Sequence, residues 1–589
     1  MTTANTLQLT GEMIIGGEAV LGTAGDVRAV DPATGAALEP AFGLATEAQT
    51  ELAATLASAA FDAYRATAPE DRARFLERAA DNIEALGDEL VERAVAETGL
   101  PEARIRGERA RTTGQLRLFA AVLREGSWQG ARIDPPLPDR QPTPRADIRQ
   151  RKVPLGPVLV FGASNFPLAF STAGGDTASA LAAGCPVIVK AHNAHPGTSI
   201  LVGCAVAQAA EESGLPRGTF SVILGRGNSV GQTLAAHPAI KAVAFTGSRA
   251  GGLALAATAA ARREPIPVYA EMSSTNPVVL LPGALASGAH DVAAGFVGSL
   301  TQHAGQYCTN PGLTFVPEGA AGDAFVTSAA AELAAQRGQT MLTAGISAAY
   351  TAGSERLEGE AGVDVVARGT NGDGPNTPAP LLAATSPEAF GANPRLAEEV
   401  FGSAGLLVRY ADTEQLTRLL EGLEGQLTAT VQLDASDAAD LAAARGLLPV
   451  LERKVGRILL NGWPTGVEVG HAMVHGGPFP ATSDSRTTSV GSLAVERFLR
   501  PVAYQNVPEA LLPEAIRDAN PLGIPRRIDG KLQLPAPAEV TPPHAEITPP
   551  HAEITPPHAE VTQPNAEITP PNAEVTQPNA EITPEDPAA

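Results

Sequence analysis

Between Lys152 and about residue 280, short apolar runs rich in β-branched residues alternate with alanine-rich stretches long enough to form helices. Strand, helix and strand in alternation predict a parallel sheet with crossover helices. Such a sheet binds ligands at the carboxyl ends of its strands, so candidate site residues are expected there. The apolar runs are Val158–Phe161, Val187–Val189, Val222–Leu224, Val243–Phe245 and Val278–Leu281, and the helical stretches are Phe170–Ala183, Thr198–Glu211 and Ser229–Ala236.

The segments on either side of this region extend the prediction. Thr46 and Gln49 form the pattern of a capping box at the start of one helix, and a second helix is expected from Phe75 to Val95, ended by Gly99. Residues 131–145 hold five prolines and predict an extended connection. Further apolar runs predict a second α/β unit after about residue 280: Leu313–Val316, Gly405–Tyr410, Thr428–Gln432 and Ile458–Asn461.

Charge and cysteine content limit the class of protein. The 589 residues carry a net charge of -22, which argues against nucleic-acid binding and against docking on anionic lipid. Three cysteines without a C-x-x-C pair indicate neither a disulfide framework nor a structural zinc site. No apolar run reaches the length of about 18 residues that a membrane helix needs. We therefore expect a cytoplasmic protein without a membrane or nucleic-acid partner.

The C-terminal part of the chain is a repeat. From Pro535 to residue 589 the pattern V/I-T-P/Q-P-H/N-A-E recurs every seven residues. Its prolines remove helix donors and exclude a coiled coil, so residues 535–589 are predicted to be disordered. The histidines of the repeat, His544, His551 and His558, offer no preformed metal site, and no metal is expected. The folded body is expected to end near residue 510, with the segment around Pro521 and Arg526 as a loose exit.

Three residues are candidates for chemistry. Cys308 follows a helical stretch, Glu271 closes an apolar strand, and Asn165 follows the first strand of the sheet. They offer a nucleophile, a general base and an amide donor beside strand or helix ends, where active-site groups collect. Taken alone, each also fits a plainer role: a buried cysteine, a solvated or paired glutamate, and a turn asparagine.

Five motifs in order resemble the aldehyde dehydrogenase superfamily over nearly all of residues 10–510. Together they are far more specific than any one of them. The family's P-W-N-F-P, F-T-G-S, E-L-G-G, G-Q-x-C and E-E-x-F-G segments correspond here to Ser164–Pro167, Phe245–Ser248, the altered Glu271–Ser274, Gly305–Cys308 and Glu398–Gly402.

The resemblance implies the chemistry of aldehyde oxidation. The Cys308 thiolate would attack the aldehyde, and the Asn165 amide would stabilise the resulting oxyanion. Hydride transfer would leave a thioester, and Glu271 would activate the water that hydrolyses it. Glu399 would hold the nicotinamide ribose, and Phe401 would pack near the nicotinamide ring.

The resemblance also implies a dinucleotide cofactor. Gly247 and Ser248 would lie near the pyrophosphate, and Lys190 would contact the adenine ribose. Asn193 replaces the acidic residue of the family's K-P-x-E segment, and Arg226 lies in the neighbouring turn. An acidic residue at that position repels a 2′-phosphate, so NADP is expected, with NAD possible. The alternative is that Arg226 is a solvated turn residue.

The implied architecture is a Rossmann-type cofactor domain (10–138 and 153–278) and an α/β catalytic domain (279–484). A small β-extension (140–152 and 485–510) would pair with a neighbouring subunit, which predicts a homo-oligomer, either a dimer or a tetramer.

Two departures from the family pattern suggest a branch. Glu271–Ser274 and His475–Pro480 resemble the branch of 2-oxoglutarate semialdehyde dehydrogenases, which also contains NADP-dependent fatty-aldehyde dehydrogenases. The substrate is therefore expected to be a small aldehyde bearing a 2-oxo acid, with an aliphatic aldehyde as the alternative. A non-catalytic scaffold is the second alternative. A substrate carboxylate favours a bidentate arginine, and the sequence does not assign it among Arg109, Arg111 and Arg486.

Overall fold

The computed structural model describes residues 9–226 and 229–535, and its first sheet has the strand order β11-β10-β7-β8-β9-β1-β2. The strands from β11 to β9 run parallel, which confirms the expected α/β alternation, and β1 and β2 extend the sheet in the antiparallel sense. The bounds are β1 Met13–Ile15, β2 Glu18–Val20, β7 Val158–Phe161, β8 Val187–Lys190, β9 Phe220–Ile223, β10 Ala242–Thr246 and β11 Val268–Glu271.

The second sheet has the order β14-β15-β16-β13-β12-β17-β18, and only β14 runs antiparallel to its neighbour. The run Val278–Leu281, expected as part of the first alternation, forms β12 of this second sheet and pairs with β13 and β17. The bounds are β12 Val278–Leu280, β13 Leu313–Pro317, β14 Val363–Arg368, β15 Leu381–Thr385, β16 Ala404–Tyr410, β17 Gln426–Gln432 and β18 Val455–Leu460. The second α/β unit is thus confirmed.

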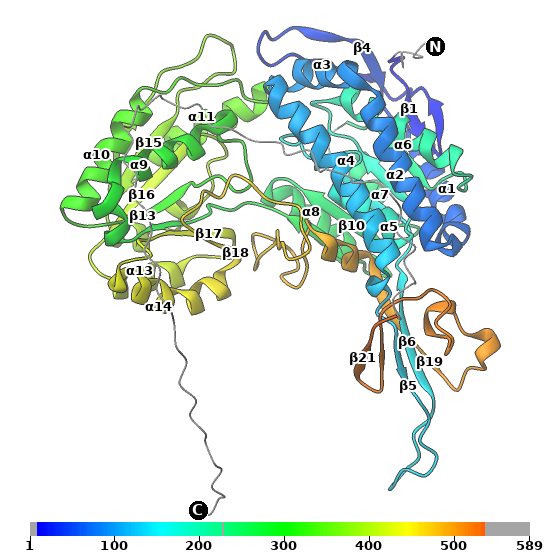
Figure 1. Cartoon of the computed structure of the whole chain (residues 1–589). Helices are drawn as coiled ribbons and strands as arrows, with labels where there is room; N and C mark the ends of the chain where they lie inside the picture. The colour runs from blue at the N-terminus through cyan, green and yellow to red at the C-terminus, as the bar shows by residue number, and fades with distance from the viewer. Residues whose placement is uncertain (1–8, 227–228, 536–589) are drawn as a thin grey trace, which may run out of the picture. The chain divides into compact units, whose positions relative to one another are not determined.

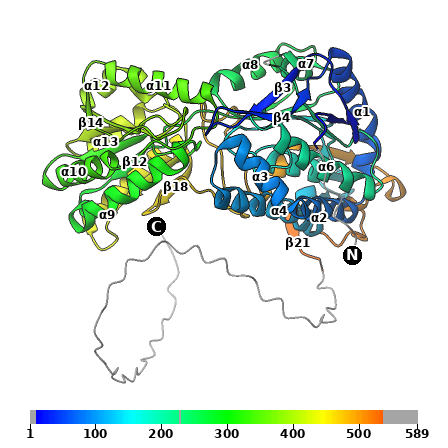
Figure 2. The ribbon, with the colours of Figure 1, turned by 90° about the horizontal axis from the view of Figure 1, so that it is seen from above.

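Helices cover both sheets (Figures 1 and 2). In both views α9 and α10 lie with the strands of the second sheet, whereas α2, α4 and α6 lie together with the first group of elements. The bounds are α1 Glu47–Ala66, α2 Pro69–Ala85, α3 Gly87–Thr98, α4 Glu102–Glu125, α5 Gly175–Ala183, α6 Pro196–Glu212, α7 Ser229–Ala236, α8 Arg249–Ala260, α9 Pro282–Thr301, α10 Ala320–Ala334, α11 Ala344–Gly359, α12 Pro387–Ala392, α13 Thr413–Gly422 and α14 Ala438–Lys454.

Local signals in the sequence explain several helix ends. Thr46 and Gln49 form the expected capping box on α1, and Gly99 ends α3 in the left-handed conformation. The single helix expected from Phe75 to Val95 is wrong, because the chain breaks at Gly87, which has a φ of 60° and divides α2 from α3. The apolar periodicity continues across Gly87 and therefore did not reveal the turn there, which glycine permits at little steric cost.

The cores of the two sheets consist mainly of the predicted strands. Val187, Ile188 and Val189 of β8 are fully buried, as expected for a parallel strand covered on both faces. Each such side chain contributes about 1.5–3 kcal/mol relative to an exposed one. In the second sheet Phe315 of β13 and Val408 of β16 lie in a separate apolar cluster. The two sheets therefore form rigid platforms from which loops carry polar side chains.

A third sheet has the order β19-β6-β5-β20-β21, visible at the lower right of Figure 1. β6 pairs with β19 along its whole length, in agreement with the predicted β-extension. The segment after residue 510 differs from the expected loose exit, since it adds β20 and β21 to this sheet. The bounds are β5 Arg132–Asp134, β6 Ile148–Pro154, β19 Leu499–Gln505, β20 Arg526–Ile528 and β21 Lys531–Gln533; a separate hairpin comprises β3 Asp26–Val30 and β4 Ala37–Gly43.

The expectation that the folded body ends near residue 510 is wrong for a physical reason. Leu512, Ile516 and Ile524 are nearly fully buried in a small apolar cluster with Ala131. The Arg149 side chain donates a hydrogen bond to the Ile516 carbonyl oxygen at 2.7 Å, which fixes the segment against β6. The sequence did not predict this packing because the few apolar residues stand among prolines and charged residues. The segment itself contains two short 3₁₀ turns.

The predicted repeat segment, residues 535–589, lies outside the described residues except for Pro535. Within the described part of the chain, no helix is both long enough and apolar enough to cross a membrane. The predicted domain boundaries otherwise stay predictions.

Replacing Ile516 with Ala should lower the free energy of unfolding by about 2–5 kcal/mol, because a fully buried side chain leaves a cavity. Leu511→Ala is the matched control, since Leu511 is 73% exposed and should change stability by less than about 0.5 kcal/mol. Urea unfolding curves of the two variants measure the difference. Equal midpoints would show that the segment after residue 510 contributes nothing to the folded body.

Candidate active site

The carboxyl ends of the parallel strands of the first sheet gather most of the candidate residues. Asn165 follows β7, Arg226 follows β9 and Ser248 follows β10, while Lys190 and Glu271 are the last residues of β8 and β11. Because these five strands run in the same direction, their ends meet at one edge of the sheet. The structure therefore places these residues where the sequence pattern predicted a ligand site.

Glu271 is a buried carboxylate, 4% exposed, at the end of β11. One carboxylate oxygen, Oε1, lies 2.9 Å from Nε2 of His475, and the other accepts a hydrogen bond from the Ser489 hydroxyl at 3.0 Å. Burial acts to raise the pKa of Glu271, but the charge and hydrogen bonds of its neighbours, His475 foremost, outweigh burial and hold the pKa below its ordinary value. Glu271 is therefore a carboxylate that stays ionised although it is out of water.

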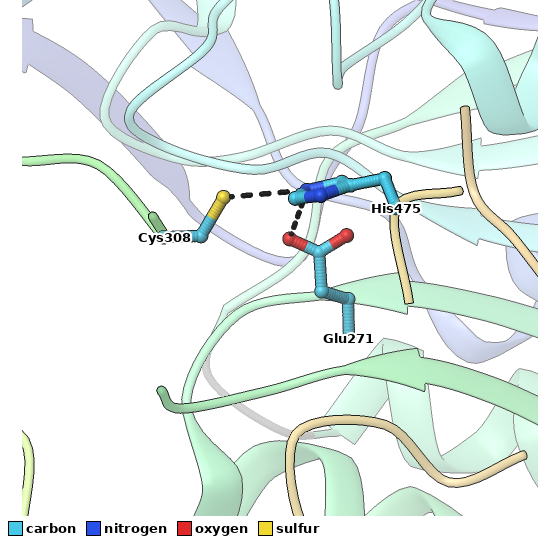
Figure 3. A group of neighbouring side chains, drawn as sticks. All are labelled: Glu271, Cys308 and His475. Atoms are coloured by element: carbon cyan, nitrogen blue, oxygen red, sulfur yellow. Dashed lines mark hydrogen bonds and ion pairs between the residues drawn. The ribbon is translucent and has the colours of Figure 1, made fainter. Parts of the chain in front are cut away.

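His475 lies between Glu271 and Cys308 (Figure 3). Its Nε2 atom is 3.5 Å from the Cys308 sulfur, and the side chain is 1% exposed. Sequence reasoning noted His475 only as part of an altered motif and gave it no role. The available signal was that His475–Pro480 replaces the family's usual P-F-G-G segment, but the partner of a loop histidine is not apparent from sequence.

The loop that carries His475 is fixed by its own hydrogen bonds. The His475 backbone N–H donates to the Thr488 hydroxyl at 2.9 Å, and the Ser489 N–H donates to the His475 carbonyl at 2.9 Å. Gly477 has a φ of 152°, and a Cβ there would lie 2.2 Å from the Gln426 carbonyl oxygen. A side chain cannot fit at that approach, so the glycine lets the loop pass close to β17.

Cys308 lies in a loop after α9 and the 3₁₀ turn Gln302–Gly305. Gly305 has a φ of 66°, and a Cβ there would lie 2.4 Å from the backbone of Gly402. The fully buried Asn276 donates hydrogen bonds to the carbonyls of Cys308 and Asn310, both at 2.9 Å, and so holds the loop. Burial and the nearby Glu271 carboxylate raise the pKa of the Cys308 thiol well above its ordinary value. The resting group is therefore a protonated thiol.

Asn165 reaches the same loop from the first sheet. Its side-chain amide donates a hydrogen bond to the Gln306 carbonyl at 3.1 Å, two residues before Cys308. One N–H of the amide is occupied in this way, and the other N–H remains a donor for a group bound at the cysteine.

A cavity of about 270 Å³ opens onto Cys308 and His475. Phe166, Phe170 and Tyr307 give it aromatic walls, α4 contributes charged residues, and residues 465–467 close it on another side. A cavity of this size suits a small molecule whose reactive end meets the sulfur.

The residues predicted to bind a dinucleotide lie at the ends of neighbouring strands. Burial lowers the pKa of Lys190 to about 8, and its Nζ atom lies 3.5 Å from the Asn193 side-chain oxygen. Asn193 in turn donates to the Gly225 carbonyl at 2.9 Å, beside the exposed Arg226. Ser248 caps α8 by accepting from the Gly251 N–H, and a helix N-terminus attracts phosphate. These donors fit a dinucleotide.

Glu399 and Phe401 lie apart from that group. They line a second hollow together with Gly305 and Tyr307, two residues of the loop that carries Cys308. Burial raises the pKa of Glu399 to about 8. The structure thus brings Glu399 and Phe401 to the loop of the nucleophile, while Lys190, Asn193 and Arg226 stand at the strand ends of the first sheet.

The site as a whole combines a nucleophile with proton acceptors. Ligand atoms of Glu271, Cys308 and His475 all lie within 4.8 Å of one another, a spacing that could also hold a metal ion. Without such an ion, a thiol beside an imidazole and an ionised carboxylate can lose its proton when an electrophile arrives. The fold and this centre define a thiol-dependent α/β enzyme.

Comparison with known proteins identifies the family. The model of the aldehyde dehydrogenase family matches residues 21–478, and the chain belongs to this family. It is therefore an NAD(P)-dependent aldehyde dehydrogenase. The α/β fold predicted from the motifs is confirmed.

Two curated relatives and one solved structure illustrate the similarity. The chain is 57% identical over 528 residues, 90% of its length and 100% of the relative's, to alpha-ketoglutaric semialdehyde dehydrogenase 2 of Azospirillum brasilense. It is 47% identical over 530 residues, 89% of its length and 98% of the relative's, to alpha-ketoglutaric semialdehyde dehydrogenase of Acinetobacter baylyi. A structure of 1-pyrroline-5-carboxylate dehydrogenase from Thermus with bound NAD shares the fold, with a TM-score of 0.70 and 23% identity over 84% of this chain and 92% of that one.

Proposed function

We propose that this aldehyde dehydrogenase oxidises 2-oxoglutarate semialdehyde to 2-oxoglutarate with NADP as cofactor. The relatives named for that substrate match nearly the whole chain at 57% and 47% identity. The observation that carries the chemistry is the contact of His475 with both Glu271 and Cys308 in one buried cluster. This cluster supplies a nucleophile and a base within the same cavity.

The proposed reaction begins at Cys308. As the thiol attacks the aldehyde carbon, its proton passes to His475, whose Nε2 atom faces the sulfur, and the second N–H of Asn165 and the Cys308 backbone N–H stabilise the oxyanion. A bound dinucleotide would supply the acceptor for the hydride that leaves the substrate carbon. The product on Cys308 is a thioester, and Glu271 then takes a proton from the water that hydrolyses it. Ser489 and His475 keep the Glu271 carboxylate ionised and oriented for this step.

The proposed cofactor contacts follow the placement of the strand ends. Lys190 and Asn193 would hold the adenosine ribose, and Gly247 and Ser248 would hold the pyrophosphate at the N-terminus of α8. Glu399 and Phe401 would hold the nicotinamide end, because they lie by the loop of the nucleophile. NADP is favoured over NAD since Asn193 places no negative charge near the 2′-position, and the exposed Arg226 stands in the adjacent turn.

A homo-oligomer, dimer or tetramer, is proposed from the third sheet. Its outermost strands, β19 on one side and β21 on the other, each have a neighbour on one side only within the described chain. An open strand edge is a ready surface for pairing with another subunit.

Glu271→Gln should still form the thioester but fail to hydrolyse it, because only the second half-reaction depends on the Glu271 base. Stopped-flow absorbance should show a burst of reduced cofactor no larger than the enzyme concentration, followed by a stall. Mass spectrometry should find the acyl group on Cys308, and Cys308→Ala should show neither burst nor adduct. A Glu271→Gln variant without burst and without adduct contradicts the assigned role.

His475→Asn should move the acidic limb of the kcat–pH profile to higher pH. His475 lowers the pKa of Glu271 against the effect of burial, so without it the carboxylate protonates at higher pH and activity is lost sooner as pH falls. The exposed His471, four residues earlier, offers the control variant His471→Asn, whose profile should match the wild type. An acidic limb that stays in place in His475→Asn would show that the pair does not set the ionisation of Glu271.

Arg226→Ala should raise the KM for NADP far more than the KM for NAD. The differential loss should be about 1.5–3 kcal/mol if a charge-assisted contact with the 2′-phosphate disappears. Arg217→Ala is the matched control, because Arg217 precedes β9 and pairs with Glu18, whereas Arg226 follows the carboxyl end of the same strand. Steady-state kinetics with both cofactors decide the matter, and equal changes in the two KM values would exclude Arg226 as the reader of the phosphate.

A further inference from the structure

The cavity at Cys308 is lined by a half-buried arginine whose guanidinium has few partners. Arg111 lines this cavity together with Cys308, Phe170 and Val467. Its Nη1 atom donates to the Val467 carbonyl, but Nε and Nη2 are buried and have no hydrogen-bond partner among the described residues. No ion pair joins Arg111 to a described acidic side chain. Burial lowers the pKa of Arg111, and the Glu108 carboxylate, which pairs with Arg104, partly opposes this effect. An unpaired guanidinium out of water is costly, which indicates that it is kept for a ligand.

The neighbouring arginines differ from Arg111 in this respect. Arg104 lies about two turns before Arg111 on the same face of α4, and its guanidinium lies 3.3 Å from the Glu108 carboxylate. Glu108 is itself engaged by the backbone N–H groups of Leu168 and Ala169, both at 2.9 Å. The Nη1 and Nη2 atoms of Arg457 donate to the backbone carbonyls of Gly466 and Pro464, both at 2.7 Å. Each of these two cations leaves one buried nitrogen without a hydrogen-bond partner among the described residues, Nη2 of Arg104 and Nε of Arg457, whereas Arg111 leaves two.

The other side chains considered for a substrate carboxylate lie elsewhere. Arg486 is 86% exposed and pairs with Asp484, and Arg109 donates to the Gly87 carbonyl. Neither lines the cavity at Cys308. Geometry therefore selects one of the arginines that the sequence left unassigned.

We infer that Arg111 is the specificity-determining residue that binds the carboxylate of the substrate at the end of the cavity opposite the reacting aldehyde. The inference rests on the proposed function, which supplies a substrate with an aldehyde at one end and a 2-oxo acid at the other. Free Nε and Nη2 groups of one guanidinium are arranged to donate to two oxygens of a carboxylate or 2-oxo acid. The aromatic ring of Phe170, 5.6 Å from the guanidinium carbon, packs against the cation and limits its movement.

The position of Arg111 on α4 makes this recognition rigid. Arg104, Glu108 and Arg111 are spaced by four and three residues, so they share one face of the helix. The Arg104–Glu108 pair fixes that face to the backbone at Leu168 and Ala169, close to Asn165. A carboxylate bound by Arg111 would therefore be held at a fixed position relative to the segment that carries Asn165, the predicted oxyanion donor.

The test compares two five-carbon aldehydes, 2-oxoglutarate semialdehyde and the uncharged pentanal. Arg111→Met should lower kcat/KM for the semialdehyde about 10- to 100-fold, mainly through KM, and change kcat/KM for pentanal less than about 3-fold. Arg111→Lys keeps the positive charge but loses the planar guanidinium that can donate two parallel hydrogen bonds. Its kcat/KM for the semialdehyde should lie between those of the wild type and Arg111→Met. Arg109→Met, two residues earlier on the same helix and outside the cavity, should leave both substrates unchanged.

Glutarate, a five-carbon dicarboxylate without an aldehyde, provides a readout independent of turnover. It should inhibit the wild type competitively, and its inhibition constant should rise at least about 10-fold in Arg111→Met, while the melting temperatures of the variants stay close to that of the wild type. Equal losses on semialdehyde and pentanal, or an unchanged glutarate constant, would overturn the inference.

The same data separate this inference from the proposed function. A wild-type enzyme that prefers pentanal to the semialdehyde refutes the proposed substrate, and the glutarate constants then still decide whether Arg111 binds a carboxylate. A wild-type enzyme that prefers the semialdehyde, with the preference unchanged in Arg111→Met, refutes the role of Arg111 alone.

Discussion

A carboxylate buried at the end of a β-strand is the constraint around which the rest of this site is arranged. Glu271 closes β11 with 4% of its surface exposed, and a charge in that position requires partners. His475 and Ser489 supply them from a loop more than two hundred residues later in the chain. The imidazole of His475, which contacts the buried Glu271 carboxylate, also faces the Cys308 sulfur. The residue that stabilises the buried charge therefore also links the base to the nucleophile.

Backbone geometry keeps these groups together. Close approaches at Gly305 and Gly477 let two loops pass within distances that no Cβ would allow, and Asn276 holds the carbonyls on both sides of the nucleophile loop. None of these three residues performs chemistry in the proposed reaction. Their effect is to make the sulfur, imidazole and carboxylate a pre-organised group, so little reorganisation is needed when an aldehyde arrives.

The sequence was sufficient for the elements and for the motif residues, because both are encoded locally. Alternating apolar runs predicted most of the strands of the two parallel sheets, and Thr46 with Gln49 predicted a helix start that the structure confirms. What it could not provide depends on contacts between distant segments. His475 acquires a partner only when its loop reaches β11, and Ile516 becomes an anchor only when it packs near Ala131. Gly87 interrupts a helical periodicity that remains regular on both sides of it.

Charge in the cavity completes the physical argument for selectivity. Glu271 contacts His475 and Ser489, Arg104 pairs with Glu108, and Arg457 donates to two backbone carbonyls, whereas Arg111 has two guanidinium nitrogens without a hydrogen-bond partner among the described residues. An aliphatic aldehyde would leave that guanidinium desolvated and unpaired in the complex, whereas an aldehyde with a distal carboxylate would satisfy it. The discrimination therefore comes as much from the penalty on the uncharged substrate as from attraction to the charged one, which is how buried polar groups achieve specificity.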